Sequence, residues 1–342
     1  MQHDNPRRYG SLLLTLVLAA VLSLCCKPAA GQDYIAYQQA FNRIDQDLRQ
    51  QQIDVALQRL DSIGELYRFV FARHCFKALQ IACVAGDTLR AAYWLERCFV
   101  QGVPRWVVRL NDITKSFCAA PPLQPIMLRY DTLRGVYQSH IDQPLAHTID
   151  TLMARDYHYT MRVNDGPFLL RKTLYGLQWL RHNVWTFHQL KTIIEQHGYP
   201  GEKLIGLPAL IDDSAKSARF VLQNGAGLEL QDRRVMFMLL HYYSTRRRSP
   251  IMAQLQACVR RGELPAWQCG LICDFAALRS SRRHPNAVQY YVRRHTPDVP
   301  LDVLNAHRED IGLNTYEEQE ENAELELAQW KTHRVNSSII LE

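Results

Sequence analysis

The sequence contains few of the residues that make tight turns. Glycine occurs 16 times and proline 15 times in 342 residues, whereas a β-sandwich or β-barrel joins many short strands through turns rich in both. Long apolar runs are scarce as well, since only one occurs, near the N-terminus, and this excludes a polytopic membrane protein. The composition, 47% hydrophobic and 22% charged, is that of a globular protein and excludes a wholly disordered or fibrous chain.

Motifs of several known chemistries are also absent. The sequence has no Gly-x-Ser-x-Gly, no glycine-rich phosphate loop and no His-x-x-x-His with a neighbouring glutamate. These absences exclude recognisable serine hydrolases, P-loop nucleotide-binding proteins and zinc peptidases. No two cysteines have the two-residue gap of a zinc knuckle or a redox motif. We therefore expect no metal and no cofactor, and a non-enzymatic protein rather than an enzyme.

Residues 1–31 have the organisation of a secretory signal peptide. Arg7 and Arg8 precede an apolar run over 11–24, and small residues follow at 29–31. This order is typical of an exported bacterial protein, and the run is too short to be a comfortable transmembrane helix. We expect cleavage close to residue 30, a secreted or periplasmic location, and no integral membrane span in the mature chain.

Two alternatives stay open for this N-terminal segment. One is a lipoprotein anchored through Cys25 or Cys26, although Leu24 stands where lipoprotein signals normally have a small residue. The other is an anchor that is not cleaved. Both alternatives leave the chain exported, and nucleic acid is then not an expected partner.

Apolar residues recur with the helical period through most of the chain. In the segment 53–67, for example, Ile53, Ala56, Leu57 and Leu60 share one helix face. The same pattern predicts further helices over 70–85, 88–100, 126–153, 168–197, 208–223, 231–246, 249–261, 265–280 and 301–312. Prolines interrupt the helices at 121–125, and the segment 156–168 is expected to be irregular or briefly extended. The sequence therefore predicts an all-α fold.

One helical hairpin resembles a tetratricopeptide unit. Small residues in the segment 78–102, such as Ala78 and Ala82, let two helices approach closely, and Gly86-Asp87 ends one helix and caps the next. Hairpins of this kind are the units of an α-solenoid. We expect three parts in the chain: a signal peptide over 1–31, tetratricopeptide-like helical hairpins over 32–120, and a multi-helix all-α domain over 126–335.

The C-terminal part contains five motifs in a recognisable order. They read IIEQHGYPGEKLIG at 193–206, FVLQNG at 220–225, GELPAWQCGLICDFA at 262–276, NAVQYY at 286–291 and HREDIGLNTYEE at 307–318. Over about residues 170–330 this order resembles an uncharacterised bacterial family, the domain of unknown function 6624, which implies no particular reaction. Backbone-shaping positions match the family pattern, whereas Asn224 replaces a histidine and Phe275 an arginine. A pocket built from the family's polar positions is therefore expected to be altered here.

Polar side chains within these motifs are the candidates for a ligand-binding site, namely Gln223, Asn224, Asp274, Gln289 and Tyr291. Buried amides and carboxylates must be hydrogen-bonded, so these residues form either a structural network, which we favour, or a pocket for a small polar ligand. Asp274 is the best candidate for a general acid or base if the protein is an enzyme. Its apolar neighbours in the sequence indicate partial burial, which raises the pKa of a carboxyl group.

Charge is distributed unevenly over the C-terminal part. Residues 233–294 contain twelve arginines and no lysine, and residues 298–326 contain ten acidic residues and one arginine, Arg308. We expect the two segments to compensate each other within the fold, because arginine pairs well with carboxylates. The alternative is an arginine-rich face that binds an anionic partner.

Seven cysteines follow the predicted signal peptide, at positions 75, 83, 98, 118, 258, 269 and 273. The odd number leaves at least one thiol unpaired. We expect buried thiols that pack as small apolar side chains, with one disulfide among Cys75, Cys83 and Cys98 as the alternative.

The sequence as a whole favours a non-enzymatic interaction protein of the bacterial cell envelope. Helical hairpins over 53–118 would present a groove to a peptide or protein partner. The alternative is a small-ligand-binding protein or a hydrolytic enzyme with a polar pocket around Asp274. Convergence of the candidate side chains on one cavity would favour this alternative, and their dispersal over unrelated faces would exclude the enzyme.

Overall fold

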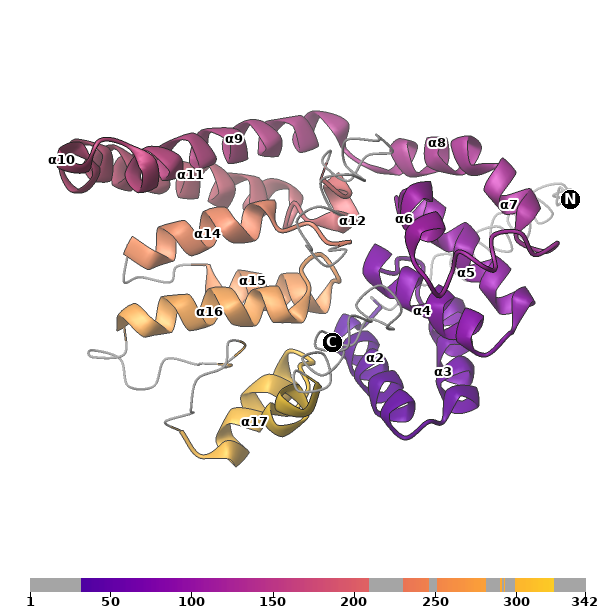
Figure 1. Ribbon diagram of the computed structural model, residues 1–342. Helices are drawn as coiled ribbons and strands as arrows, with labels where there is room; N and C mark the ends of the chain where they lie inside the picture. The colour runs from indigo at the N-terminus through magenta and orange to yellow at the C-terminus, as the bar shows by residue number, and fades with distance from the viewer. Residues whose placement is uncertain are drawn as a thin grey trace, which may run out of the picture. The chain divides into compact units, whose positions relative to one another are not determined.

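The fold is all-α, as the sequence predicts (Figure 1). The computed structural model describes residues 32–208, 230–245, 251–280, 290, 292 and 299–322, and each regular element within these ranges is helical. The residues from Tyr34 to Glu342 form a compact unit of their own. The expected signal peptide over 1–31 and residues 209–223 of an expected helix lie outside the described residues.

Two helical hairpins begin this unit. Helix α2 (Tyr34–Arg49) packs on α3 (Ile53–Leu66), and α4 (Ala72–Val84) packs on α5 (Thr88–Val100). The turn between α4 and α5 has the predicted chemistry: Gly86 takes a φ of +72°, and the side chain of Asp87 accepts a hydrogen bond from the Arg90 amide at 3.0 Å. A short helix, α6 (Arg105–Leu110), follows. The likeness of these hairpins to tetratricopeptide units stays a prediction.

The next stretch differs from the expected single helix over 126–153. It is divided into α7 (Gln124–Leu128), α8 (Tyr130–His140) and α9 (Gln143–Asp165). Asp142 causes the break before α9, because its side chain accepts a hydrogen bond from the Leu145 amide at 2.9 Å and caps the new helix, while Pro144 occupies the first turn, where proline is tolerated.

The expectation of an irregular segment over 156–168 is wrong for residues 156–165, which continue helix α9. Helix α9 buries few of its residues along this stretch, so its apolar positions are sparse and its periodicity is weak. The helix ends at Gly166 and Pro167.

Helices α9 and α11 (Gly176–His197) form a long hairpin (Figure 1). Its tip consists of the short α10 (Phe168–Leu170) and a π-helical turn over Arg171–Tyr175. Neither α9, α11 nor another helix in the described ranges combines the length and apolarity that crossing a bilayer requires.

The remaining helices complete the C-terminal part. They are α12 (Glu202–Ile205), α14 (Arg234–Thr245), α15 (Met252–Arg260), α16 (Ala266–Ser280) and α17 (Leu301–Asp310). Helix α14 packs against α16 on one side and against the α9–α11 hairpin on another.

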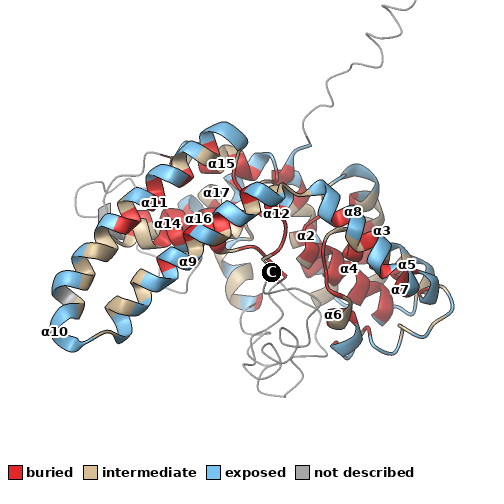
Figure 2. Cartoon of the chain, turned by 90° about the horizontal axis from the view of Figure 1, so that it is seen from above, coloured by how far each residue is buried: buried red, intermediate tan, exposed pale blue. Residues whose placement is uncertain are grey.

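Two clusters of buried apolar side chains hold the unit together (Figure 2). The first lies mainly within α2–α8 and contains the fully buried Trp94, and the second lies mainly within α9–α17 and contains Leu239. Tyr34 belongs to the first cluster and its neighbour Ile35 to the second. Helix α2 is therefore part of both cores. The expected domain division into 32–120 and 126–335 stays a prediction.

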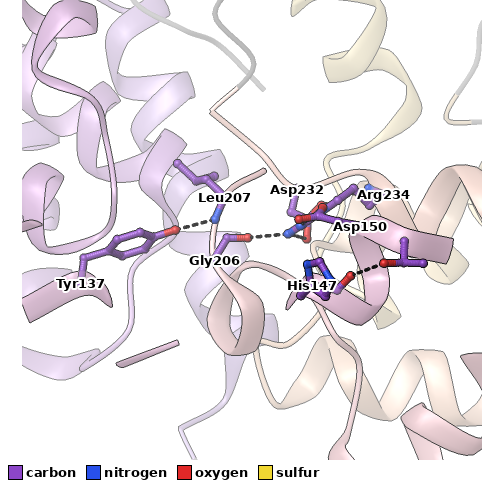
Figure 3. Close-up of polar contacts among 8 residues, drawn as sticks. Tyr137, His147, Asp150, Gly206, Leu207, Asp232 and Arg234 are labelled. Carbon is purple, nitrogen blue, oxygen red and sulfur yellow. Dashed lines mark hydrogen bonds and ion pairs between the residues drawn. The ribbon is translucent and has the colours of Figure 1, made fainter. Parts of the chain in front are cut away.

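Tyr137 links α8 to the segment that follows α12 (Figure 3). Its hydroxyl accepts a hydrogen bond from the Leu207 amide at 2.7 Å. Its ring lies against Gly102 and Gly206, which both have positive φ; a Cβ at these positions would come within 2.5 Å and 2.1 Å of Tyr137, respectively. The tyrosine fits only because both positions lack a side chain.

Arg234 fixes the turn that carries Gly206 (Figure 3). Its Nη2 donates to the Gly206 carbonyl at 3.1 Å, its Nε to Asp232 Oδ1 at 2.9 Å, and its Nη1 to Asp150 Oδ1 at 2.6 Å. The guanidinium is buried. Each of its three nitrogens donates to one of these acceptors, so the side chain has a structural role.

Glu202 links α12 to the start of α4. Its Oε1 accepts a hydrogen bond at 2.5 Å from the amide of Ala72, the first residue of α4, and thereby satisfies one of the amides that a helix start leaves unpaired. The carboxyl group is buried, and burial raises the pKa of Glu202 to about 8.

The seven cysteines among the described residues are free thiols, and all except the half-buried Cys118 are buried. Burial raises the pKa of Cys75 to about 12, so this thiol is neutral at physiological pH. The prediction of buried thiols is confirmed, and the alternative disulfide among Cys75, Cys83 and Cys98 is not formed.

Candidate functional site

Asp274 is the one candidate residue from the sequence that the structure describes. Gln223, Asn224, Gln289 and Tyr291 lie outside the described residues, so their convergence on one pocket stays a prediction. Asp274 lies on α16, and its two carboxylate oxygens accept hydrogen bonds from the amides of Tyr290 at 2.6 Å and Val292 at 2.8 Å. Its carboxylate therefore attaches the backbone at Tyr290 and Val292 to α16.

Arg308 lies on the other side of the same segment. It is almost completely buried, and its guanidinium donates to the carbonyl of Tyr290, to the carbonyl of Asn314 at 2.6 Å and to Gln319 Oε1 at 2.9 Å. These three acceptors are neutral. Burial lowers the pKa of Arg308 to about 10, and the negative charge of Asp274 opposes this effect. The group stays protonated at neutral pH and places a buried positive charge in the fold.

A cavity of about 260 Å³ borders Arg308. Its described lining comes from helix α2, the start of α4, the segment before α14, helix α16, Val292, helix α17 and the residues after α17. Seven of the described residues that line it are polar and three are apolar: Gln38, Asn42, Arg73, Arg233, Trp267, Val292, Arg308, Leu313, Asn314 and Gln319.

The described lining of this cavity is positively charged. It contains Arg73, Arg233 and Arg308, and no acidic residue. The guanidinium of Arg233 lies over the ring of Trp267, with its Cζ atom 4.7 Å from the ring centroid, and this stacking restricts the orientation of the side chain. Three arginines on one small cavity contribute positive charge to its described lining, and such charge acts more strongly where the walls exclude water.

Hydrogen bonds hold one wall of the cavity in place. Gln38 Nε2 donates to Asn42 Oδ1 at 3.2 Å, and Asn42 Nδ2 donates to the carbonyl of Gly312 at 2.9 Å. Gly312 has a φ of +84°, and a Cβ there would lie 3.1 Å from Gln38. The turn after α17 thus approaches α2 closely, and the two amide side chains are positioned before a ligand binds.

The chemistry of this lining fits the binding of an anion. Arginine recognises carboxylate and phosphate groups through paired hydrogen bonds, and the four amide side chains can donate to further oxygens. Asp274 is not among the lining residues. Within the described residues, no three histidine, cysteine or acidic side chains form a group that could hold a metal ion.

The sequence pointed to this region without identifying the cavity. The motif at 307–318 and the arginine-rich segment 233–294 contain Arg308 and Arg233, and the possibility of an anion-binding face followed from that charge. Gln38, Asn42 and Arg73 were missed, because they lie far from these motifs in the sequence and carry no local signature. The polar spacing of Gln38 and Asn42, one helical turn apart, is the only signal that a sequence offers for them.

The chain was compared with profiles of protein families, with curated proteins and with solved structures, and none of these comparisons found a match.

Proposed function

We propose that this protein binds a small anionic compound, with one or more carboxylate or phosphate groups, in the cavity beside Arg308. One observation carries the proposal: the described lining brings together three arginines and four amide side chains without an acidic residue. We propose further that it is a binding protein and not an enzyme.

An anion in this cavity would interact with Arg308 in particular. The hydrogen-bond acceptors of Arg308 are neutral, and the lowered pKa of its guanidinium reflects a charge that burial disfavours. A carboxylate or phosphate in the cavity would supply negative charge close to it. The anion therefore stabilises Arg308 while Arg73 and Arg233 provide donors from the facing walls.

The position of Asp274 supports binding over catalysis. A general base must reach the proton that it removes, whereas both oxygens of Asp274 accept backbone hydrogen bonds and the side chain does not line the cavity. The hydrolytic alternative consequently has no candidate base among the lining residues that the structure describes.

Three sequence-based interpretations belong to the same proposal. The signal-peptide pattern over 1–31 supports a secreted or periplasmic location in the bacterial cell envelope. The motifs over about 170–330 support membership of the domain of unknown function 6624 family. The helical hairpins over 53–118 are proposed to bind a protein or peptide partner.

The test is thermal melting of residues 32–342 with citrate, succinate and inorganic phosphate, against sodium chloride of equal ionic strength. A ligand at about a hundred times its Kd stabilises the native state by about 2.7 kcal/mol, which raises the Tm of a chain of this size by roughly 5 °C. The variants Arg73→Gln and Arg233→Gln should lose this rise. Arg129→Gln, which removes an exposed arginine outside the cavity, serves as the matched control.

Two outcomes would refute the binding proposal. One is the absence of a Tm rise beyond the salt control with every anion tested. The other is an equal rise in the wild type, Arg73→Gln and Arg233→Gln, because binding would then occur elsewhere on the surface.

A further inference from the structure

The tip of the α9–α11 hairpin exposes an unusual set of apolar side chains. Phe168 is 79% exposed and Leu169 82%, and Leu170, Leu174 and Leu177 are also exposed. We refer to these five residues as the apolar tip. Figure 2 shows the region around α10 as largely exposed. Single exposed apolar residues are ordinary on a protein surface, but a contiguous group marks a contact site.

The apolar tip lies away from the second core. Asp156 of α9 is buried and lies 2.7 Å from His241 Nδ1 of α14, which joins the hairpin to the rest of the fold. Nine further residues of α9 lead from there to its end at Asp165, a distance of about 14 Å at the helical rise. Figures 1 and 2 both show α10 at the far end of this hairpin.

Basic residues surround the apolar tip. The segment 155–181 contains five basic and two acidic residues. Arg162 and Arg181 lie on the hairpin behind the tip, whereas of the two acids Asp156 is buried against His241 and only Asp165 is exposed. The part of the hairpin next to the apolar tip therefore has a net positive charge.

Aromatic side chains accompany the arginines on the hairpin. Tyr157 and Trp185 are exposed, and Arg155 and Arg162 lie over the rings of Trp185 and Tyr175 at 5.7 Å and 4.2 Å. Tyrosine and tryptophan are enriched where proteins meet the headgroup region of a bilayer, because one end of each ring is apolar and the other polar.

We propose that the apolar tip inserts into the surface of a bilayer that contains anionic lipids, while the basic residues of the hairpin contact the headgroups. The charge of the hairpin complements an anionic surface, and roughly five apolar side chains suit a shallow insertion of about 5–10 Å. A stable protein–protein interface buries about 1,200 Å² or more, whereas five exposed side chains offer only a few hundred. A lipid surface therefore fits this tip better than a second copy of the chain. This proposal is independent of the anion-binding cavity.

The test is flotation of residues 32–342 with lipid vesicles, since Tyr34–Glu342 form a compact unit and the apolar run before residue 25 would itself bind lipid. Vesicles of phosphatidylcholine alone are compared with vesicles that contain roughly one third phosphatidylglycerol. The double variant Phe168→Ser/Leu169→Ser removes the apolar tip. Leu89→Ser/Leu128→Ser removes two leucines that are 76% and 85% exposed elsewhere and is the matched control.

The wild type and the control should bind the anionic vesicles, and Phe168→Ser/Leu169→Ser should bind at least tenfold more weakly, because each apolar side chain contributes roughly tenfold. Arg162→Gln/Arg181→Gln should weaken binding to anionic vesicles, and added salt should do the same, because salt screens the headgroup charge. All the changed side chains are exposed or half-buried, so circular dichroism should show that the variants are folded.

Three outcomes of the flotation experiment would overturn the proposal. The wild type does not float with anionic vesicles, the tip variant floats as well as the wild type, or the loss in the tip variant is matched by Leu89→Ser/Leu128→Ser. Sedimentation without lipid tests whether the apolar tip instead binds a second copy of the chain. Self-association of the wild type that Phe168→Ser/Leu169→Ser abolishes would assign the tip to contacts between copies of the chain and would also overturn it.

Discussion

Protonation of Glu202 should make the stability of this fold depend strongly on pH. Burial raises the pKa of the carboxyl group from 4.5 to about 8 in the folded state, while the unfolded chain keeps the ordinary value. Between these two pH values the folded protein holds a proton that the unfolded protein has released. The contribution of Glu202 to the free energy of unfolding is therefore greatest below pH 4.5. It falls as the pH rises to about 8 and stays constant above that pH.

The size of the effect follows from the shift. One pKa unit corresponds to about 1.36 kcal/mol, so the full window accounts for about 4 to 5 kcal/mol. Between pH 5.5 and pH 7.5 the free energy of unfolding should decrease by about 2.7 kcal/mol because of Glu202 alone. Burial also raises the pKa of Asp232, which adds a decrease of the same sign, so the contribution of Glu202 has to be isolated by substitution.

The substitution Glu202→Gln isolates it. Glutamine keeps an oxygen that can accept the 2.5 Å hydrogen bond from the Ala72 amide, but it does not titrate. Urea unfolding at pH 5.5 and pH 7.5 should show a decrease in stability that is about 2.7 kcal/mol smaller in Glu202→Gln than in the wild type. Glu65→Gln, at an exposed position of α3, is the control and should keep the wild-type decrease. Equal pH dependence in the wild type and Glu202→Gln would refute the reasoning.

Three further predictions concern the core, a turn and the cavity. Lys77→Met should lower the free energy of unfolding by about 3–5 kcal/mol in urea, because it leaves Asp45 buried without the cation it pairs with; the double variant Asp45→Asn/Lys77→Met should recover part of the loss. Gly206→Ala should lower the Tm, since φ is +67° and the new Cβ would come within 2.1 Å of a phenol oxygen, whereas Gly135→Ala, in a helix with open space, should raise it slightly. Asp274→Ala should speed hydrogen exchange at the two amides that its carboxylate binds, and unchanged exchange would contradict the assigned contacts.

Local patterns predicted the fold more completely than the site. The pattern of apolar residues located α3, α5 and α16 within two residues of their ends, because α3 and α5 bury one face in a core and α16 is buried along most of its described length. It failed over 156–165, where α9 extends along a hairpin that is largely exposed and few positions have to be apolar. The break at Asp142 was readable in principle from the Asp-x-Pro order.

The cavity was not predictable from spacing. Its described lining extends from Gln38 to Gln319, and the residues meet only through long-range packing of α2 against the turn at Gly312. The sequence identified Asp274 instead, whose carboxylate holds the segment of Val292 next to the cavity. The charge composition was a better guide to the cavity than the motif that contains Asp274. It indicated an arginine-rich region, but it did not show where in the fold these arginines lie.

The contact between Asn42 and Gly312 can form only late in the synthesis of the chain. The two residues are 270 positions apart, so α2 leaves the ribosome well before the turn that it packs against. At about 5–20 residues per second, this interval is roughly 15–50 s. A nascent chain or fragment that stops before α17 lacks one wall of the cavity and leaves part of α2 uncovered. A fragment that ends before α17 is therefore expected to lack the proposed anion site, although it contains α2, α4 and α16.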